Sequence, residues 1–277
     1  MILLAVLVPA MLSANKQYFM GLSLLMISAG AWEWGRLNGL SCVSSIAGAL
    51  LSFLASVFMV DAGWDLRAPA MAWWLSGIGW VVLGGALLRM GVPAWQCLPA
   101  VLRWLTGLVL LVLAWLALIR AHRMGVNFLL SLLVLVWAAD VVAYFAGRAL
   151  GGRIFHRKLA PSISPGKTWE GAIGGFLGVL LIAALWIVWD QGHLQLEPSL
   201  HTRLWSKGVW FALPAWVFLT AMSVVGDLVE SLVKRSAGVK DSSGLLPGHG
   251  GVLDRVDALL PTLPLAMLLC DLLGLLA

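Results

Sequence analysis

Long apolar runs separated by short polar segments make up almost the whole chain. An α-helix rises about 1.5 Å per residue, so a helix that crosses the bilayer core needs about 20 mostly apolar residues. Nine runs meet or approach this length, although the first, with about 12 residues, is short for a span. They cover residues 1–12, 18–35, 41–60, 70–88, 101–119, 127–147, 171–189, 209–233 and 252–277. The pattern predicts about nine transmembrane helices and leaves no connection long enough for a soluble domain.

The composition supports the same class of protein. Hydrophobic types make up 61% of the 277 residues and charged types 11%, whereas soluble domains contain about 25% charged residues. This excludes an ordinary soluble protein and a disordered one. The apolar runs are continuous, which argues against an outer-membrane barrel, because barrel strands alternate apolar and polar residues. The sequence therefore predicts an all-α polytopic integral membrane protein with a single membrane domain over residues 1–277.

The basic residues are divided unevenly between the two sets of loops. Twelve of the 18 lysines and arginines lie at the loops that follow the even-numbered spans, and six lie at the others. Cytoplasmic loops carry the excess of such residues. We therefore expect segments 148–167 and 234–255 to lie in the cytoplasm, together with the N-terminus, and the C-terminus to lie on the far side.

Polar side chains recur with helical spacing on three of the predicted spans. They are Asp140, Tyr144 and Arg148; Ser223, Asp227, Glu230, Ser231 and Lys234; and Asp254, Arg255 and Asp257. Asp227 lies about 10 Å below the end of its helix at 1.5 Å per residue, where a charge must be paired or hydrated. For any single pair of these side chains, a structural ion pair, such as Glu230 with Lys234, is as good an explanation as a functional site. The three stripes together favour a buried, hydrated site.

Two further features are read from short spacings. Glu33 and Arg36, three residues apart, predict a structural pair at the end of the second span. In the segment 234–257, three glycines surround His249. Glycines let a backbone approach a phosphate closely, so this segment is a candidate phosphate-binding loop.

The segment 162–171 contains Gly-Lys-Thr, which is part of a P-loop motif. A P-loop also requires a glycine five residues before Gly166, and that position is Pro161. The segment is therefore interpreted as a basic, turn-rich loop, in which Ser164, Lys167 and Thr168 can contact an anion.

Residues 231–257, SLVKRSAGVKDSSGLLPGHGGVLDRVD, resemble the signature of the phosphatidate cytidylyltransferases, also called CDP-diacylglycerol synthases. AWEWGRL at 31–37, DVVAYFAGR at 140–148, SPGKTWEG at 164–171 and GDLVESLVKR at 226–235 agree with that family. The resemblance thus covers nearly the whole chain, and it implies N-terminal helices in 1–125 and catalytic helices with cytoplasmic loops in 126–277. Ala258 departs from it, since the family usually has serine there, and the first span lacks the usual basic residues.

The resemblance implies transfer of the cytidylyl group of CTP to phosphatidate, which yields CDP-diacylglycerol and pyrophosphate. Both substrates are anions, so catalysis is expected to rest on positioning and charge neutralisation. Mg²⁺ prefers carboxylates plus substrate phosphates, and Asp227 and Asp254 are its predicted ligands, with Asp257 and Asp241 behind them. The predicted catalytic residues are Asp227, Lys234, Arg235, Lys240, Asp241, His249, Asp254, Arg255 and Asp257. The predicted substrate contacts are Ser164, Lys167, Thr168, Ser231, Gly250 and Gly251.

Two other functions remain open at this point. A CTP-dependent kinase of a polyprenol or phytol would transfer the γ-phosphate and release CDP instead of pyrophosphate. An ion-coupled transporter could also bury Asp140, Asp227 and Asp254, but it would be expected to show repeat symmetry and broken helices. We expect CTP, phosphatidate and membrane lipid as partners in a bacterial inner membrane, expect no nucleic acid, and allow for a homodimer.

Overall fold

The computed structural model describes residues 2–276, and within this range it contains helices and no strand. The helices are α1 (Ile2–Leu12), α2 (Lys16–Leu37), α3 (Cys42–Asp61), α4 (Trp64–Arg67), α5 (Ala70–Ile78), η1 (Gly79–Gly84), α6 (Gly85–Met90), α7 (Val92–Cys97), α8 (Ala100–Met124), α9 (Val126–Leu150), α10 (Trp169–Gln191), α11 (Leu200–Trp205), α12 (Val209–Ser236), α13 (Leu253–Val256) and α14 (Leu259–Leu272). Element η1 is a π-helix that joins α5 to α6 without a break. The predicted all-α class is confirmed for the described residues.

Six helical stretches among the described residues are long and apolar enough to cross a membrane. They are Cys42–Asp61, Ala70–Met90, Ala100–Met124, Val126–Leu150, Trp169–Gln191 and Val209–Ser236. A polytopic membrane protein is therefore confirmed, but the number nine is not. The predicted span 1–12 forms a helix of 11 residues, and the predicted span 252–277 is divided into α13 and α14. Residues 1 and 277 of these two spans lie outside the described range.

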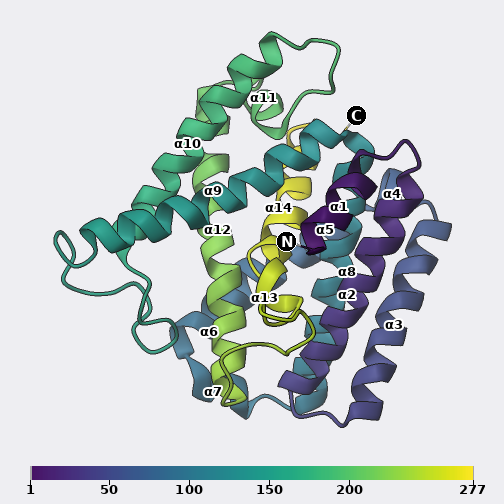
Figure 1. The fold of residues 1–277 in the computed structure, drawn as a ribbon, viewed down its shortest axis with the longest axis vertical. Coiled ribbons are helices and arrows are strands. Elements are labelled where there is room, and N and C mark those ends of the chain that lie inside the picture. The colour runs from purple at the N-terminus through teal and green to yellow at the C-terminus, as the bar shows by residue number, and fades with distance from the viewer. Residues whose placement is uncertain (1, 277) are drawn as a thin grey trace.

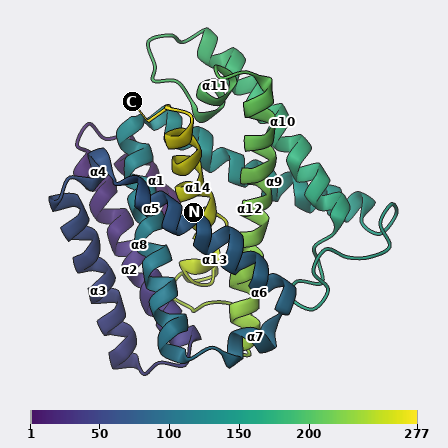
Figure 2. The ribbon, with the colours of Figure 1, turned by 180° about the vertical axis from the view of Figure 1, so that it is seen from behind.

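The helices pack around a centre formed by α8, α12 and α14 (Figures 1 and 2). Helices α2 and α3 lie side by side next to α8, and α9 pairs with α10. The α9–α10 contact depends on glycines of α10, because a Cβ on Gly175 would lie 2.6 Å from the carbonyl oxygen of Ala139. Small residues of this kind let two helices in a membrane approach closely. The packing fixes where α10 begins, and with it the loop that precedes α10.

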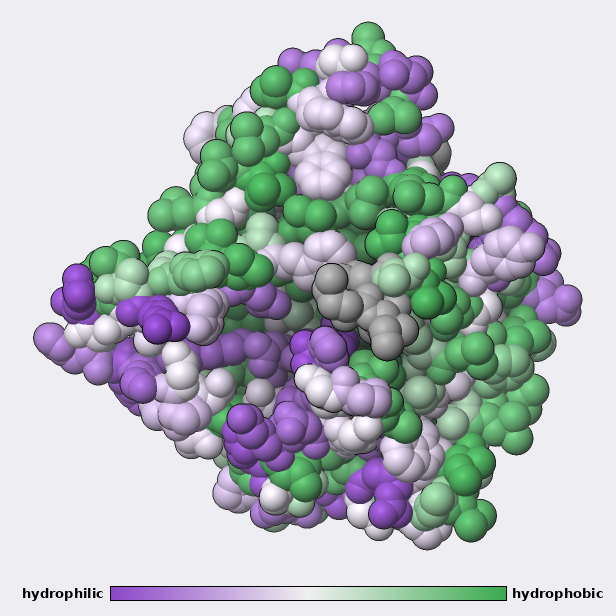
Figure 3. Space-filling view, in the orientation of Figure 1, coloured by the Kyte–Doolittle hydropathy of each residue, from purple (hydrophilic) through white to green (hydrophobic). Residues whose placement is uncertain are grey.

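The connections between the helices lie at two opposite ends of the bundle. At one end, the Gln96 amide donates to the carbonyl oxygen of Ser236 (3.1 Å), and residues 151–168 meet α12 through an ion pair described below. At the other end, the Arg203 guanidinium donates to the carbonyl oxygen of Leu275 (2.9 Å). The basic segments 148–167 and 234–255 thus share one end, as their predicted loop positions required. In Figure 3 hydrophilic surface gathers at the left and lower centre, over these segments, whereas α3 at the right is mostly hydrophobic.

Candidate active site

Helix α12 brings its polar stripe to the end of the bundle that carries the basic segments. The side chain of Asp227 is 31% exposed, and its Oδ2 pairs with Nζ of Lys167 at 2.6 Å. The hydroxyl of Ser231, one turn later, lies 3.3 Å from Oδ1. The two predicted site segments, residues 162–171 and α12, therefore meet at this pair. Among residues 2–276, Ser231 provides the one hydrogen bond to Oδ1, so of the two oxygens of Asp227 it is the better placed to accept a ligand.

Lys234 lies between two carboxylates. Its ammonium forms an ion pair with Glu230 on the same helix, which is the structural alternative given for this pair above, and a second with Oδ1 of Asp254 at 2.5 Å. The three side chains are nearly buried, with exposed fractions of 13% for Lys234, 4% for Glu230 and 8% for Asp254. Removal of one member of such a buried group leaves an uncompensated charge. This cluster is thus a rigid part of the site.

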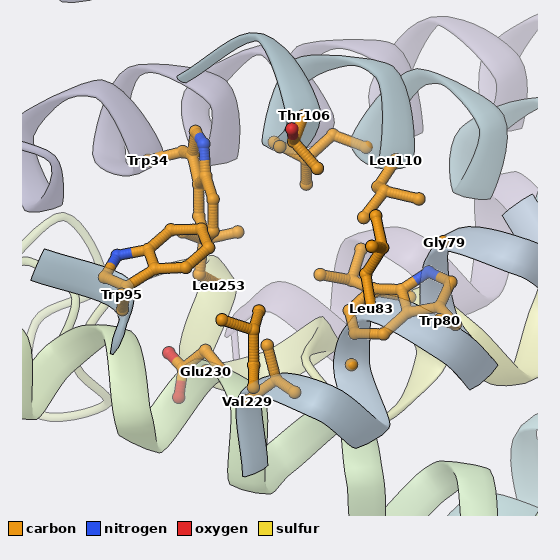
Figure 4. A pocket seen from close by; sticks show the side chains of 15 residues that line it. Trp34, Gly79, Trp80, Leu83, Trp95, Thr106, Leu110, Val229, Glu230 and Leu253 are labelled. Carbon is orange, nitrogen blue, oxygen red and sulfur yellow. The ribbon is translucent and has the colours of Figure 1, made fainter. Parts of the chain in front are cut away.

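Glu230 also borders a narrow apolar cavity between α2, η1, α8 and α12 (Figure 4). The cavity is lined by the rings of Trp34, Trp80 and Trp95. The indole N–H groups of Trp80 and Trp95 find no hydrogen-bond partner in the part of the chain that the structure describes. Among residues 2–276, Lys234 is the only cation that pairs with Glu230. Glu230 on one side and Asp254 on the other therefore fix the position of Lys234.

Asp254 organises the segment that precedes α13. Its Oδ2 accepts from the backbone N–H groups of Ser242 and Gly251, each at 2.8 Å, and from the hydroxyl of Ser242 at 2.9 Å. Burial opposes ionisation of this carboxyl, but these hydrogen bonds and the one from Lys234 outweigh burial and lower the pKa of Asp254 to about 2. Both oxygens of Asp254 are therefore engaged within the protein.

A residue that the sequence analysis placed outside the site holds the same segment. Glu33, at the end of α2, is fully buried and does not pair with Arg36, which is exposed and donates to the carbonyl oxygen of Leu40. The predicted Glu33–Arg36 pair is wrong, because the two side chains point to different surroundings. The carboxylate of Glu33 instead accepts four hydrogen bonds from the segment 242–253. An acidic residue at the end of an apolar span, between tryptophans and glycines, was the available signal.

The loop between α9 and α10 is folded in a similar way. Oε1 of Glu170, in the first turn of α10, accepts from the backbone N–H groups of Gly152 (3.0 Å), Ile154 (3.1 Å) and Phe155 (2.9 Å). Thr168 caps α10, since its hydroxyl accepts from the N–H of Gly171 at 3.1 Å. These local contacts give Thr168 a structural role and place Lys167 directly before the helix, against Asp227.

The remaining predicted residues lie at the rim of the cluster. Arg235, Lys240, Asp241, His249 and Arg255 are exposed. Nε of Arg255 donates to the carbonyl oxygen of His249 at 2.9 Å, which closes the glycine-rich turn. Gly250 has a φ of +79°, which a residue with a side chain rarely adopts, and it pairs with Leu246 in an isolated bridge. The Nδ1 of His249 lies 3.1 Å from the carbonyl oxygen of Pro247. The imidazole and the rim cations Arg235, Lys240 and Arg255 are nevertheless exposed, so that they can contact a solute.

Several carboxylates near Asp227 are candidates for a Mg²⁺ site. Asp140 on α9 and Asp257 after α13 lie near enough to Asp227 to interact with it electrostatically. Within residues 2–276, however, no three His, Cys, Asp or Glu side chains are grouped so that they alone could hold a metal ion. The arrangement fits a metal that arrives with substrate phosphates and takes one or two carboxylates, as Mg²⁺ commonly does. Asp227 fits this better than Asp254, whose oxygens are both engaged.

Comparison with known proteins identifies the class to which this fold and site belong. The profile of the cytidylyltransferase family matches residues 1–273, so the chain belongs to that family. Among its relatives, the phosphatidate cytidylyltransferase of Pseudomonas aeruginosa is 34% identical over 251 residues, which cover 86% of this chain and 82% of the relative. That of Brucella abortus is 40% identical over 233 residues, 82% of this chain and 68% of the relative. That of Haemophilus influenzae is 46% identical over 140 residues, 50% of this chain and 44% of the relative.

Proposed function

We propose that the chain transfers the cytidylyl group of CTP to phosphatidate and releases pyrophosphate. The observation that carries the proposal is the family match over residues 1–273, together with relatives named for this activity. The site supports it, because the residues of the resembling motif converge on one end of the bundle as a group of cations and carboxylates. Two anionic substrates require such cations to bring their phosphates together.

The contacts suggest which side chains bind the substrate phosphates. Lys167, paired with the partly exposed Asp227, is placed to exchange this partner for a phosphate oxygen. The rim cations Arg235, Lys240 and Arg255 are placed to contact the same anion, and Lys234 contributes its charge from its fixed position between Glu230 and Asp254. The phosphate of phosphatidate is itself the nucleophile and is already ionised near neutral pH, so no strong general base is needed. The main contribution of the protein is then orientation and charge neutralisation, as in other phosphoryl transfers.

Asp227 is the proposed protein ligand of Mg²⁺, with Asp257 beside it, and Asp254 is proposed to position Lys234 and the loop. The bound ion would supply further neutralisation of the CTP phosphates. Asp254 as a metal ligand remains a prediction, which would require its bonds to Lys234 or Ser242 to open. Asp241, exposed at the rim, likewise remains a predicted outer ligand.

The location of the site follows from the same proposal. CTP is a cytoplasmic solute, and the end of the bundle with segments 148–167 and 234–255 carries the excess of basic residues. We therefore place this end in the cytoplasm of a bacterial cell and the helices in the inner membrane. The nine spans also stay a proposal, in which α2, with 22 residues, α1 and α14 would add to the six apolar helices. The homodimer stays a prediction.

The decisive experiment is product analysis with the purified protein, CTP labelled on the cytidine, phosphatidate and Mg²⁺. We expect label in the lipid and one pyrophosphate for each lipid formed, and we expect chelation of Mg²⁺ to stop both. If CDP and a newly phosphorylated lipid alcohol were formed instead, the protein would be a lipid kinase.

A further inference from the structure

One buried carboxylate joins the two ends of the segment 242–253. Oε1 of Glu33 accepts from the hydroxyl of Ser243 (2.5 Å) and the N–H of Val252 (2.9 Å). Oε2 accepts from the N–H of Leu253 (2.8 Å) and lies 3.1 Å from the hydroxyl of Ser242. Each oxygen therefore contacts one hydroxyl from the start of the segment and one backbone N–H from its end. This pattern closes the segment into a loop against α2.

The surrounding backbone leaves room for this carboxylate and for little else. A Cβ on Gly251 would lie 2.0 Å from Oγ of Ser242 and 2.5 Å from Oε1 of Glu33, closer than real Cβ contacts come. A Cβ on Gly30, one turn before Glu33, would lie 3.3 Å from the side chain of Leu253. Glycine at 251 is thus required by the close approach of the loop to Glu33.

The same loop is coupled to the cluster around Lys234. The hydroxyl of Ser242 lies within hydrogen-bond distance of both Glu33 and Asp254, and Asp254 pairs with Lys234. A hydroxyl has one hydrogen, so it can donate to only one of these carboxylates at a time. A contiguous chain of polar contacts therefore runs from Glu33 through Ser242 and Asp254 to Lys234.

We infer that Glu33 is a positioning residue, which fixes the shape of residues 242–253 and so sets Asp254, Lys234 and the rim cations for the phosphates of the nucleotide. The inference rests on the proposed function. Glu33 itself is fully buried behind the loop and acts through it.

The test compares two Glu→Gln substitutions that should differ sharply. In Glu33→Gln, each orientation of the amide turns its NH₂ toward one backbone N–H, either that of Val252 or that of Leu253, and this donor loses its acceptor. A buried donor without an acceptor has a free-energy cost that corresponds to a factor of about 10 to 100 in an equilibrium constant. We expect kcat/KM for CTP to fall by this factor, with an increase in KM. The control is Glu197→Gln, at the opposite end of the bundle, where the side chain is 66% exposed and its amide can contact water. We expect that variant to stay within about twofold of the wild type in the same assay.

Hydrogen–deuterium exchange provides a readout that does not depend on turnover. In Glu33→Gln we expect faster exchange of the amides in 242–253, and in Glu197→Gln no change there. Unchanged exchange in that segment together with an unchanged KM for CTP would overturn the inference. So would a loss of activity in both glutamine variants to the same extent.

A second variant keeps the test open if Glu33→Gln fails to fold. Gly251→Ala disturbs the same contact from the other side, so it should give the same faster exchange and higher KM, and wild-type behaviour would count against the inference. If the wild type itself transferred no cytidylyl group, the proposed function would fail, whereas the exchange comparison would still decide whether Glu33 holds the loop.

Discussion

Asp254 and Asp227 should differ in their contribution to stability although both are needed for turnover. The pKa of Asp254 is lowered from 3.8 to about 2 by hydrogen bonds that outweigh its burial. A shift of about two pKa units corresponds to about 2 to 3 kcal/mol of folding free energy at neutral pH. Asp254→Asn should remove most of this contribution, because in either orientation its amide NH₂ faces Lys234 or the N–H groups of Ser242 and Gly251.

Asp227 is the matched control on the neighbouring helix. Its side chain is 31% exposed and that of its partner Lys167 is 23% exposed, and ion pairs of such exposure contribute about 0 to 1 kcal/mol. At about 2 to 4 °C for each kcal/mol, we expect the unfolding midpoint of Asp254→Asn to fall by about 4 to 12 °C and that of Asp227→Asn by at most about 4 °C. Both should lose nearly all turnover, and the double variant should be little worse than either, because residues that act as one unit are not additive.

The assay is thermal unfolding in detergent, followed by tryptophan fluorescence, alongside turnover at neutral pH. A pKa that is lowered on folding stabilises the protein above the unfolded-state pKa, and this contribution is lost as the pH falls through the folded-state pKa. The midpoints of wild type and Asp254→Asn should therefore converge between about pH 4 and pH 2. Equal loss of stability in the two single variants would refute the division of roles, and near-normal turnover in both would refute the site.

Two further predictions concern the topology and the far end of the bundle. A cysteine introduced at Ser162, in the α9–α10 loop, should react with a thiol reagent in inside-out vesicles. On intact cells it should stay unlabelled by an impermeant reagent. The opposite pattern would place the site on the wrong side of the membrane for CTP. Asp271→Asn should keep most of the activity in the same turnover assay, because Asp271 ends α14 at the opposite end of the bundle from Lys234, and loss of activity would show that the site extends farther than we describe.

Contacts within one helix could be predicted from the sequence, and contacts between distant segments could not. The helical spacing of Asp227, Glu230, Ser231 and Lys234 placed these side chains on one face, and the ion pair between Glu230 and Lys234 is confirmed. Periodicity carries no information on which segment lies opposite that face. The pairing of Lys167 with Asp227 depends on how the glycines of α10 pack that helix against α9, which the sequence pattern does not specify.

The same limit explains the failed Glu33–Arg36 pair. A spacing of three predicted that Glu33 pairs with Arg36, whereas its partners lie more than 200 residues away in the chain. The division of the predicted span 252–277 has a local cause instead. Pro261 has no N–H to donate to the carbonyl oxygen of Asp257, so the helix is interrupted between α13 and α14, where a Cβ on Gly226 would lie 2.4 Å from the same oxygen. Apolar character alone missed this proline signal.

The bonds of Glu33 have a consequence for biosynthesis of the protein. Val252 is 219 residues further along the chain, so at about 5 to 20 residues per second the ribosome needs about 10 to 40 seconds to reach it after Glu33. For nearly all of that interval none of the four donors of this carboxyl exists. The side chain must meanwhile stay in contact with water, so the burial of Glu33 is a late step, completed only when residues 242–253 have been made.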